Sequence, residues 1–196
     1  RPLEMVQVAE YDLRPAVYSG EGIAAAAAAA KQVDKKISVH LKIDTGMRRV
    51  GIDPDLAITL SKAIHEKSSL VLDGLWTHCA VADLTNDPFT INQLNTFDQA
   101  VSGIRQEGIN SNILHAANSA LAIDNLDGRY DLVRCGLAIY GISPFDHDRP
   151  EIDLKPAMKV RSEVSYMKSI EAGERVSYGL SWESKRQTRI ATIPMG

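Results

Sequence analysis

Apolar and polar residues alternate strictly between positions 37 and 44, which is the period-2 pattern of a β-strand. The apolar members of the run are Ile37, Val39, Leu41 and Ile43, and the polar members are Ser38, His40, Lys42 and Asp44. The strand stops before Gly46, a residue that permits backbone turns which other residues resist. In parallel α/β folds, ligands bind at the carboxyl ends of strands. The charged residues at this end, Lys42, Asp44, Arg48 and Arg49, therefore predict a site.

Similar apolar runs predict further strands, and periodic apolar stripes predict helices between them. The predicted strands cover residues 16–18, 37–43, 70–77, 112–115 and 132–134. The predicted helix starts are Ser19 as an N-cap and the pairs Asp53-Pro54 and Asp87-Pro88. The stripes of the second and third helices are Leu56, Leu60 and Ile64, and Ile91, Leu94, Val101 and Ile104. Strand and helix alternate about every 30 residues, which predicts βαβ units and a parallel sheet.

The pattern changes after Gly141. Residues 143–156 contain three prolines and four acidic residues but few apolar ones, as is typical of a domain junction. Beyond the junction, residues 157–169 and 188–193 are predicted strands with no helix between them. The fold class is therefore α/β: residues 1–146 form the later strands of a partial (β/α)8 TIM-type barrel, with 1–14 as a connection. Residues 147–196 begin an all-β domain.

Composition narrows the class of protein. The chain has 196 residues, of which 44% are hydrophobic and 24% charged, as in ordinary globular proteins. Its formal net charge of −3 argues against a nucleic-acid-binding protein. No apolar run approaches the roughly 18 residues of a membrane span. The two cysteines, Cys79 and Cys135, fit no disulfide framework and no metal spacing, which favours a reducing, cytoplasmic compartment.

Polar residues follow most of the predicted barrel strands. They are Lys42, Arg49, His78, Asn118, Ser119 and Arg134. This set contains no Ser-His-Asp or Cys-His pair and no cluster with metal-ligand spacing. Cations beside small donors suit an anion, most simply a phosphate bound by Ser119 and the backbone amides near Gly136. Spacing alone therefore predicts an anion-binding barrel of unknown reaction.

Each candidate also has a purely structural interpretation. Lys42 could end a solvated strand, His78 could fill a core position, and Ser119 could cap a helix. Arg134 could form an ion pair and Tyr178 could pack its ring within a strand. The remaining histidines, His40, His65, His115 and His147, are assigned only structural roles. Both cysteines are interpreted as small buried side chains.

Five short motifs occur in series along the chain. They are KIDTGMRRVG at 42–51, THCAVAD at 77–83, HAANSA at 115–120, VRCGLAIYG at 133–141 and VSYG at 176–179. In this order they resemble alanine racemase, and the series is much more specific than any single motif. The resemblance implies a pyridoxal 5′-phosphate (PLP) enzyme that interconverts L- and D-alanine. It also implies an α/β barrel followed by a β domain, and a homodimer with shared active sites.

The resemblance assigns roles to individual residues. Arg134 would face the pyridine nitrogen of PLP, and because an arginine rarely releases its proton, that nitrogen would stay unprotonated. His78 would hold Arg134 in place. Tyr178, reaching the other subunit's cofactor, would exchange the α-proton of the substrate on the face opposite the Schiff-base lysine.

The resemblance also assigns binding roles. Ser119 and the backbone amides of Gly136 and Leu137 would bind the phosphate, with support from Asn118. Two further residues are assigned to the substrate: Arg49 would contact its carboxylate, and Lys42, often carbamylated in the family, would position Arg49.

Two departures from the family pattern matter. The Schiff-base lysine is expected upstream of Arg1, so we expect this chain alone to be inactive. Arg48 stands where the family usually has glycine. Three alternatives stay open: a racemase of the same fold acting on serine or a broader set of amino acids, a non-catalytic PLP-binding barrel protein, and a non-enzymatic scaffold.

Overall fold

The structure is a computed structural model that describes residues 4–84, 87–124, 127–146 and 152–195. It forms two compact units, Arg1–Pro156 and Ala157–Gly196. The predicted domain boundary between residues 146 and 147 stays a prediction, because residues 147–151, including His147, lie outside the described part of the chain.

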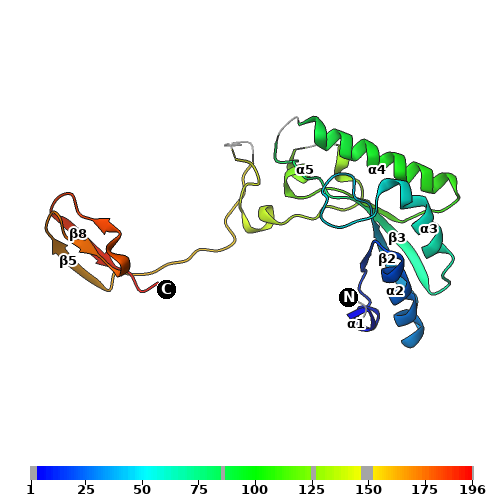
Figure 1. Cartoon of the computed structure of the whole chain (residues 1–196), viewed down its shortest axis with the longest axis horizontal. Helices are drawn as coiled ribbons and strands as arrows, with labels where there is room; N and C mark the ends of the chain where they lie inside the picture. Colours follow the sequence, from blue (N-terminus) through cyan, green and yellow to red (C-terminus); the bar gives the residue numbers. More distant parts are fainter. Residues whose placement is uncertain (1–3, 85–86, 125–126, 147–151, 196) are drawn as a thin grey trace. The chain divides into compact units, whose positions relative to one another are not determined.

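The first unit is built on a parallel sheet with helices beside it (Figure 1). Its strands, in sheet order, are β1 (Ala16–Val17), β2 (Ile37–Lys42), β3 (Leu70–Trp76) and β4 (Ile113–His115). Its α-helices are α1 (Met5–Glu10), α2 (Gly20–Gln32), α3 (Ala57–His65), α4 (Pro88–Gln106) and α5 (Ser119–Ile123). Short 3-10 turns are η2 (Pro54–Leu56), η3 (Asp127–Arg129) and η4 (Leu137–Tyr140). Since neighbouring strands are parallel, their carboxyl ends lie along one edge of the sheet.

Local sequence explains where the helices begin. The Ser19 hydroxyl accepts a hydrogen bond from the Gly22 N–H at 3.1 Å, which caps α2 as predicted. The Asp87 carboxylate accepts from the Phe89 N–H at 2.8 Å and caps α4. At the third predicted start, Pro54 opens the 3-10 turn η2, which leads into α3.

The two faces of the sheet differ in chemistry. On one face, Val39, Leu41 and Ile43 are fully buried in an apolar core that they share with residues of α2, α3 and α4. The other face carries polar and aromatic side chains of β2, β3 and β4, among them His40, Lys42, Trp76 and His115. The strict alternation in β2 therefore separates an apolar face from a polar interior.

Two predictions for the first unit are wrong. Residues 5–10 form the helix α1 rather than a connection, because Met5 and Ala9 lie one turn apart and both are buried. Residues 132–134 form no strand in the part of the chain that the structure describes. The Arg134 N–H does donate to the Ala117 carbonyl, but the Leu114 N–H bonds to the Asp131 carboxylate instead of a backbone carbonyl, which interrupts the ladder.

The apolar stripes were predicted only in part. Ile64 is buried in α3, but Leu56 belongs to η2 and is exposed. In α4, Leu94, Val101 and Ile104 are buried as expected, whereas Ile91 is exposed and the fully buried ring of Phe97 completes the stripe.

The second unit consists of two antiparallel strand pairs. These are β5 (Tyr166–Ile170) with β8 (Thr188–Thr192), and β6 (Arg175–Val176) with β7 (Trp182–Glu183), with the 3-10 turn η5 (Tyr178–Leu180) between β6 and β7. The predicted switch to β-structure is therefore present, although of residues 157–169 only 166–169 belong to a strand, β5. Residues 157–164 before it are exposed and form no strand, and Ser165 bonds to the Thr192 carbonyl just ahead of β5.

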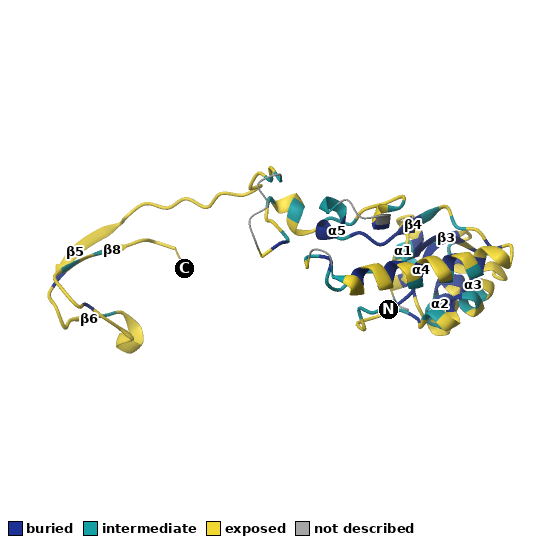
Figure 2. Cartoon of the chain, turned by 90° about the horizontal axis from the view of Figure 1, so that it is seen from above, coloured by how far each residue is buried: buried dark blue, intermediate teal, exposed yellow. Residues whose placement is uncertain are grey.

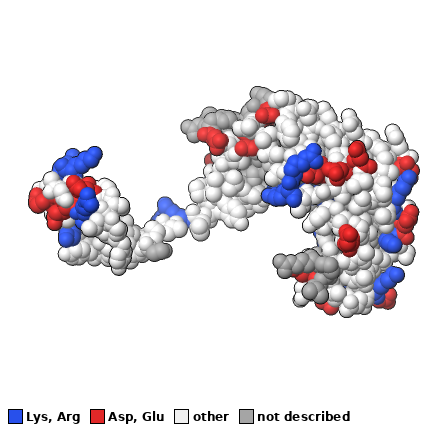
Figure 3. Space-filling model, in the orientation of Figure 1, with Lys and Arg blue, Asp and Glu red and all other residues white. Residues whose placement is uncertain are grey.

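The two units differ in how many of their residues are buried, whereas both carry mixed charges on the visible surface. Figure 2 shows buried residues along the strands and inner helix faces of the first unit, whereas the second unit is almost entirely exposed. Acidic and basic side chains are interspersed on the visible face of each unit (Figure 3). Among the described residues, every helix is too short or too polar to cross a membrane.

Candidate functional site

The loop after β2 is folded around Asp44. One oxygen of its carboxylate accepts from the N–H groups of both Gly46 and Arg48, each at 3.0 Å. Arg48 has a φ of 54°, in the left-handed region that favours glycine, which matches the glycine expected at this position. Next to it, Arg49 is exposed. The loop therefore presents Arg49 to solvent from a turn that one carboxylate holds.

The loops after β2 and β3 are tied together by Gln93 of α4. Its side-chain oxygen accepts from the Ala80 N–H at 2.8 Å in the loop after β3, and its amide group donates to the His78 carbonyl at 3.1 Å and to the Thr45 hydroxyl of the loop after β2 at 3.4 Å. The hydroxyls of Thr45 and Thr77 bond to each other at 2.7 Å. Gln93 is almost fully buried, so α4 fixes the backbone on which His78 lies.

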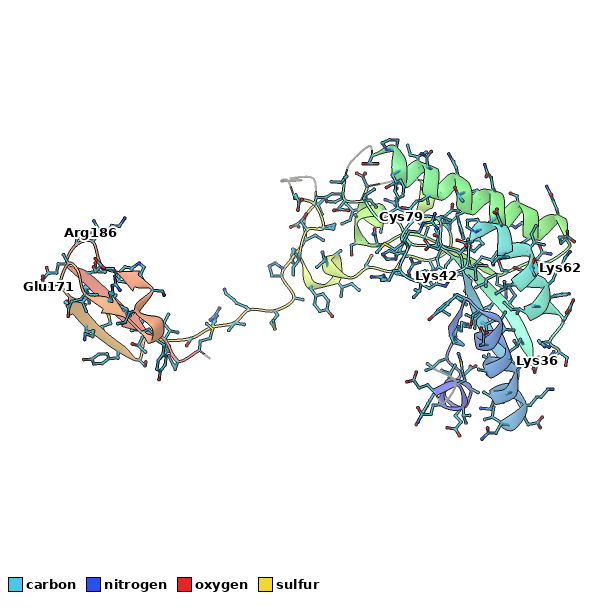
Figure 4. All side chains as sticks on the ribbon, viewed as in Figure 1. Lys36, Lys42, Lys62, Cys79, Glu171 and Arg186 are labelled. Carbon is cyan, nitrogen blue, oxygen red and sulfur yellow. The ribbon has the colours of Figure 1, made fainter. Side chains whose placement is uncertain are left out.

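One pocket of about 330 Å³ contains all six residues that the sequence assigns to the cofactor. They are His78, Asn118, Ser119, Arg134, Gly136 and Leu137, and the pocket is completed by Asp83, Ala120 and Pro144. Its volume is at the small end of the range for ligand sites. These residues come from three loops that follow β3 and β4, so the pocket lies at the carboxyl edge of the sheet. Figure 4 shows Lys42 and Cys79 in that region, with Lys36 at the opposite end of β2.

Ser119 and Asn118 have distinct roles in this pocket. The Asn118 side chain, not Ser119, caps α5 by accepting from the Leu121 N–H at 3.0 Å. The Ser119 hydroxyl accepts from the N–H groups of Gly136 and Ala138 at 2.8 and 3.3 Å. Because it accepts both bonds, its own O–H remains a donor, and among the described residues no acceptor for it is found. The capping interpretation of Ser119 is therefore wrong.

Arg134 and His78 are in direct contact, as the resemblance implies. Nη2 of Arg134 lies 3.2 Å from Nδ1 of His78. Burial, and then the charge of Arg134, lower the pKa of His78 to about 4. Burial also lowers the pKa of Arg134 to about 10, so Arg134 is still a cation at neutral pH while His78 is neutral.

Lys42 is buried at the polar face of the sheet. Its Nζ lies 4.7 Å from the centre of the Trp76 ring, and Cζ of Arg134 lies 4.6 Å from the same centre. Burial, and then the nearby charge of Arg49, lower the pKa of Lys42. The solvated-strand-end interpretation of Lys42 is therefore wrong.

Tyr178 belongs to the second unit, and its side chain is fully exposed. The backbone around it has unusual angles: Ser177 has a φ of 67° and Leu180 a φ of 47°. Non-glycine residues seldom adopt such conformations, which are found in turns and cluster at functional sites. The sequence-based role of Tyr178 stays a prediction.

Some residues of this region were not singled out from the sequence. His115, which was assigned a structural role, contacts Arg134, and Trp76 stacks on His115 with ring centres 5.4 Å apart. Both residues end predicted strands, so their positions were a usable signal. Gln93 lies within a helix, and its polar character on a buried stripe was the only indication. Of the cysteines, Cys79 is buried as expected and Cys135 is half-buried.

A parallel α/β sheet with cations and hydroxyl donors at its carboxyl edge defines a segment of an α/β barrel. Comparison with known families is more specific. Residues 1–144 match the alanine racemase N-terminal domain, and residues 157–196 match the alanine racemase C-terminal domain. The chain belongs to the alanine racemase family.

Individual relatives agree with this assignment. The alanine racemase of Treponema denticola is 38% identical, over 98% of this chain and 52% of its own length. That of Methanococcus maripaludis is 33% identical, over 98% and 52%. The solved structure of an alanine racemase from Clostridium difficile 630 superposes with a TM-score of 0.90 at 31% identity, covering all of this chain and 52% of that one. The predicted fold class is confirmed. The chain spans about half the length of the curated relatives it matches.

Proposed function

We propose that this chain supplies the cofactor-binding part of a PLP-dependent alanine racemase, an isomerase that interconverts L- and D-alanine. The observation that carries the proposal is the pocket at the carboxyl edge of the sheet, which unites all six residues that the resemblance to alanine racemase assigns to the cofactor. The match of residues 157–196 to a C-terminal domain counts against the alternative of a PLP-binding barrel without a second domain.

The residues of the pocket fit the two ends of PLP. The free O–H of Ser119 and the backbone amides of Gly136 and Leu137 would hold the phosphate, and the Gly136 amide, which donates to the Ser119 hydroxyl in the structure, would exchange that acceptor for a phosphate oxygen. Arg134, which only donates hydrogen bonds, would meet the pyridine nitrogen and leave it unprotonated. When bound, PLP supplies an electron-withdrawing ring that makes the α-proton of an amino acid easier to remove.

The remaining residues are proposed to act on the substrate. Arg49, exposed on its turn, would bind the alanine carboxylate, and Lys42 would position Arg49. Tyr178 would take or give the α-proton from one face, within a homodimer that shares its active sites. The second base in this scheme is a lysine outside these 196 residues, so the proposal of racemase activity concerns a protein that carries both groups.

Pyridoxine 5′-phosphate tests the pocket directly, because it has no aldehyde and cannot react with a lysine. Trp76 lies against Arg134 and serves as the fluorescent reporter, in a Trp182→Phe background that removes the second tryptophan. We expect saturable quenching, weakened about tenfold by Ser119→Ala and unchanged by Ser102→Ala, an exposed serine of α4. Absence of saturable binding would contradict the proposed function.

A further inference from the structure

Arg134 is held from behind by a second histidine, His115. Nη1 of Arg134 lies 2.6 Å from Nδ1 of His115, while Nη2 donates to the carbonyls of Thr77 and Ala116 at 2.8 and 3.1 Å. A guanidinium group only donates, so Nδ1 of His115 must be the acceptor. The proton of the neutral His115 ring is therefore on Nε2.

That proton has a defined acceptor. Nε2 of His115 lies 2.8 Å from Nδ1 of His40, which consequently accepts and carries its own proton on Nε2. Nε2 of His40 faces Oδ2 of Asp73 at 3.5 Å, which is an ion-pair distance and not a hydrogen bond, and it has no hydrogen-bond partner among the described residues. The donor direction thus runs from Arg134 through His115 to His40, whose remaining N–H faces the Asp73 carboxylate.

Asp73 is a suitable end for this chain of donors because it stays ionised. Asn112 donates to its Oδ1 at 2.8 Å, and Nε of Arg14 lies 2.8 Å from its Oδ2. Burial raises the pKa of the Asp73 carboxyl, but the hydrogen bond from Asn112 and the charge of Arg14 outweigh burial and hold the pKa below its usual value.

The strands are shaped to bring these groups together. The register of β2 and β3 shifts between Val39 and His40, so that His40 pairs with Gly74 and Asp73 has no partner in the ladder. A Cβ on Gly74 would lie 2.6 Å from Nδ1 of His40, so only glycine leaves room for the ring. His40, Asp73 and His115 are 8%, 6% and 5% exposed.

We propose that His115, His40 and Asp73 form a positioning relay that acts on the cofactor pocket through Arg134. The relay fixes the plane of the guanidinium group and, by ending on a carboxylate, makes His115 a stronger acceptor, as carboxylates do behind metal-bound histidines. None of the three lines the pocket, so each acts only through Arg134. The relay deepens the proposed function, because Arg134 matters to catalysis only if it meets the cofactor.

The donor direction can be measured without any ligand. Long-range 1H–15N NMR of the 15N-labelled full chain reports which ring nitrogen of each histidine carries the proton. We expect the Nε2–H form for His40, His78 and His115 at neutral pH, with assignments unaffected by His65→Gln, a change at an exposed histidine. An Nδ1–H form at His40 or His115 would overturn the relay.

Coupling along the relay is tested from its far end. Asp73→Asn is expected to shift the His115 ring resonances even though His40 lies between the two residues. Asp55→Asn, at an exposed site, should leave these resonances unchanged. Arg14→Gln, at a side chain that is 60% exposed, is a milder second variant if Asp73→Asn does not fold, and it should shift them less. Unchanged His115 resonances in a folded variant at Asp73 or Arg14 would refute the coupling.

Two substitutions at His115 separate an effect on the pocket from a general loss of structure. His115→Met removes the acceptor and should weaken pyridoxine 5′-phosphate binding about tenfold without changing the affinity for inorganic phosphate. His115→Gln, which can accept and donate, should restore most of the affinity. Equal losses for both ligands would overturn the role of His115. If the unmodified chain does not bind pyridoxine 5′-phosphate, the proposed function fails, while the ligand-free NMR still decides the relay.

Discussion

The two units of the chain differ in what organises them. The first encloses an apolar core beside a parallel sheet, and its polar side chains bond to one another across residues far apart in sequence, as His40 and His115 do. In the second, Ile170 and Ser184 are the only buried residues among 157–195. Most of its side-chain hydrogen bonds join residues within eight positions of each other, such as the Arg175–Glu183 pair on β6 and β7.

Because of this difference, the two units can fix the side chains of a site to different degrees. The first unit has enough buried surface to fix the side chains of a pocket, because packing and buried hydrogen bonds restrict their rotamers. The second buries too little apolar surface to impose such restraint, since small units rarely do so without added cross-links. The exposed Tyr178 is therefore oriented chiefly by its local backbone.

Truncation of a buried side chain should give the largest difference in stability effect between the two units. Phe97 is fully buried and packs edge-on against Tyr130 at 5.4 Å, so Phe97→Ala is expected to lower the free energy of unfolding by about 3–5 kcal/mol. Val160→Ala, in the second unit at a side chain that is 67% exposed, should change it by less than about 0.5 kcal/mol. Urea unfolding measures both, and equal effects would contradict the comparison.

Acid should destabilise the first unit alone. Burial, and then Arg134, lower the pKa of His78 to about 4 and of His115 to about 3, whereas a free imidazole titrates near 6.5. Between these values the unfolded chain binds protons that the folded unit does not, so the stability present above pH 6.5 falls as pH is lowered. From pH 7 to pH 5 we expect a loss of about 2–3 kcal/mol, allowing for screening of the half-buried His78.

The origin of that loss is checked by fluorescence of Trp76 during urea unfolding at each pH. Residues 157–196 contain no histidine, so the pH dependence should be confined to the first unit. The variant His65→Gln, at an exposed histidine, should keep the same slope. A stability that is flat between pH 7 and pH 5 is incompatible with neutral, buried His78 and His115.

Two glutamines allow a matched test of polar burial. Gln93→Leu leaves the Ala80 N–H and the His78 carbonyl without their partner, which should destabilise the first unit by about 2 kcal/mol. Gln187→Leu removes an exposed bond to Glu171 in the second unit and should have almost no effect. Thermal unfolding ranks the two, and a similar loss in both would mean that Gln93 is not restrained as described.

Of the variants expected to destabilise the chain, Gly74→Ala should have the smallest effect, and it is compared with a second glycine of the first unit. The new Cβ would push the His40 ring away from β3, at a cost of about 1–2 kcal/mol, and should disturb the His40–His115 bond in the NMR spectrum. Gly20→Ala, where nothing lies within 4 Å of the added Cβ, should be neutral or slightly stabilising. Equal stability of the two variants would show that Gly74 is not required for packing.

Much of the pocket could be predicted from the sequence because its residues follow strands. Alternation located β2, apolar runs located β3 and β4, and the parallel arrangement brings their carboxyl ends to one edge. Roles for Arg134 and Tyr178 came only from resemblance to a family. The structure brings Arg134 and His78 together, which spacing alone did not predict.

The relay could not be predicted in this way. It depends on a register shift at His40 and on contacts between residues 75 positions apart, and neither leaves a local pattern. The two-residue strands β6 and β7 are too short to show periodicity. Residues 132–134 form no strand because the Leu114 N–H donates to the Asp131 carboxylate instead of a backbone carbonyl. Local patterns thus located the elements, whereas long-range hydrogen bonds decided the details.

The proposed function requires that the pocket at the carboxyl edge of the sheet is the binding site of a phosphorylated pyridine. Backbone 1H–15N NMR of the full chain during titration with pyridoxine 5′-phosphate tests it most directly. We expect saturable shifts concentrated at the amides of Ser119, Gly136 and Leu137 and at the Arg134 side chain. Shifts concentrated elsewhere, for example at the lysines around Ser68 and Ser69, or none at all, would contradict it.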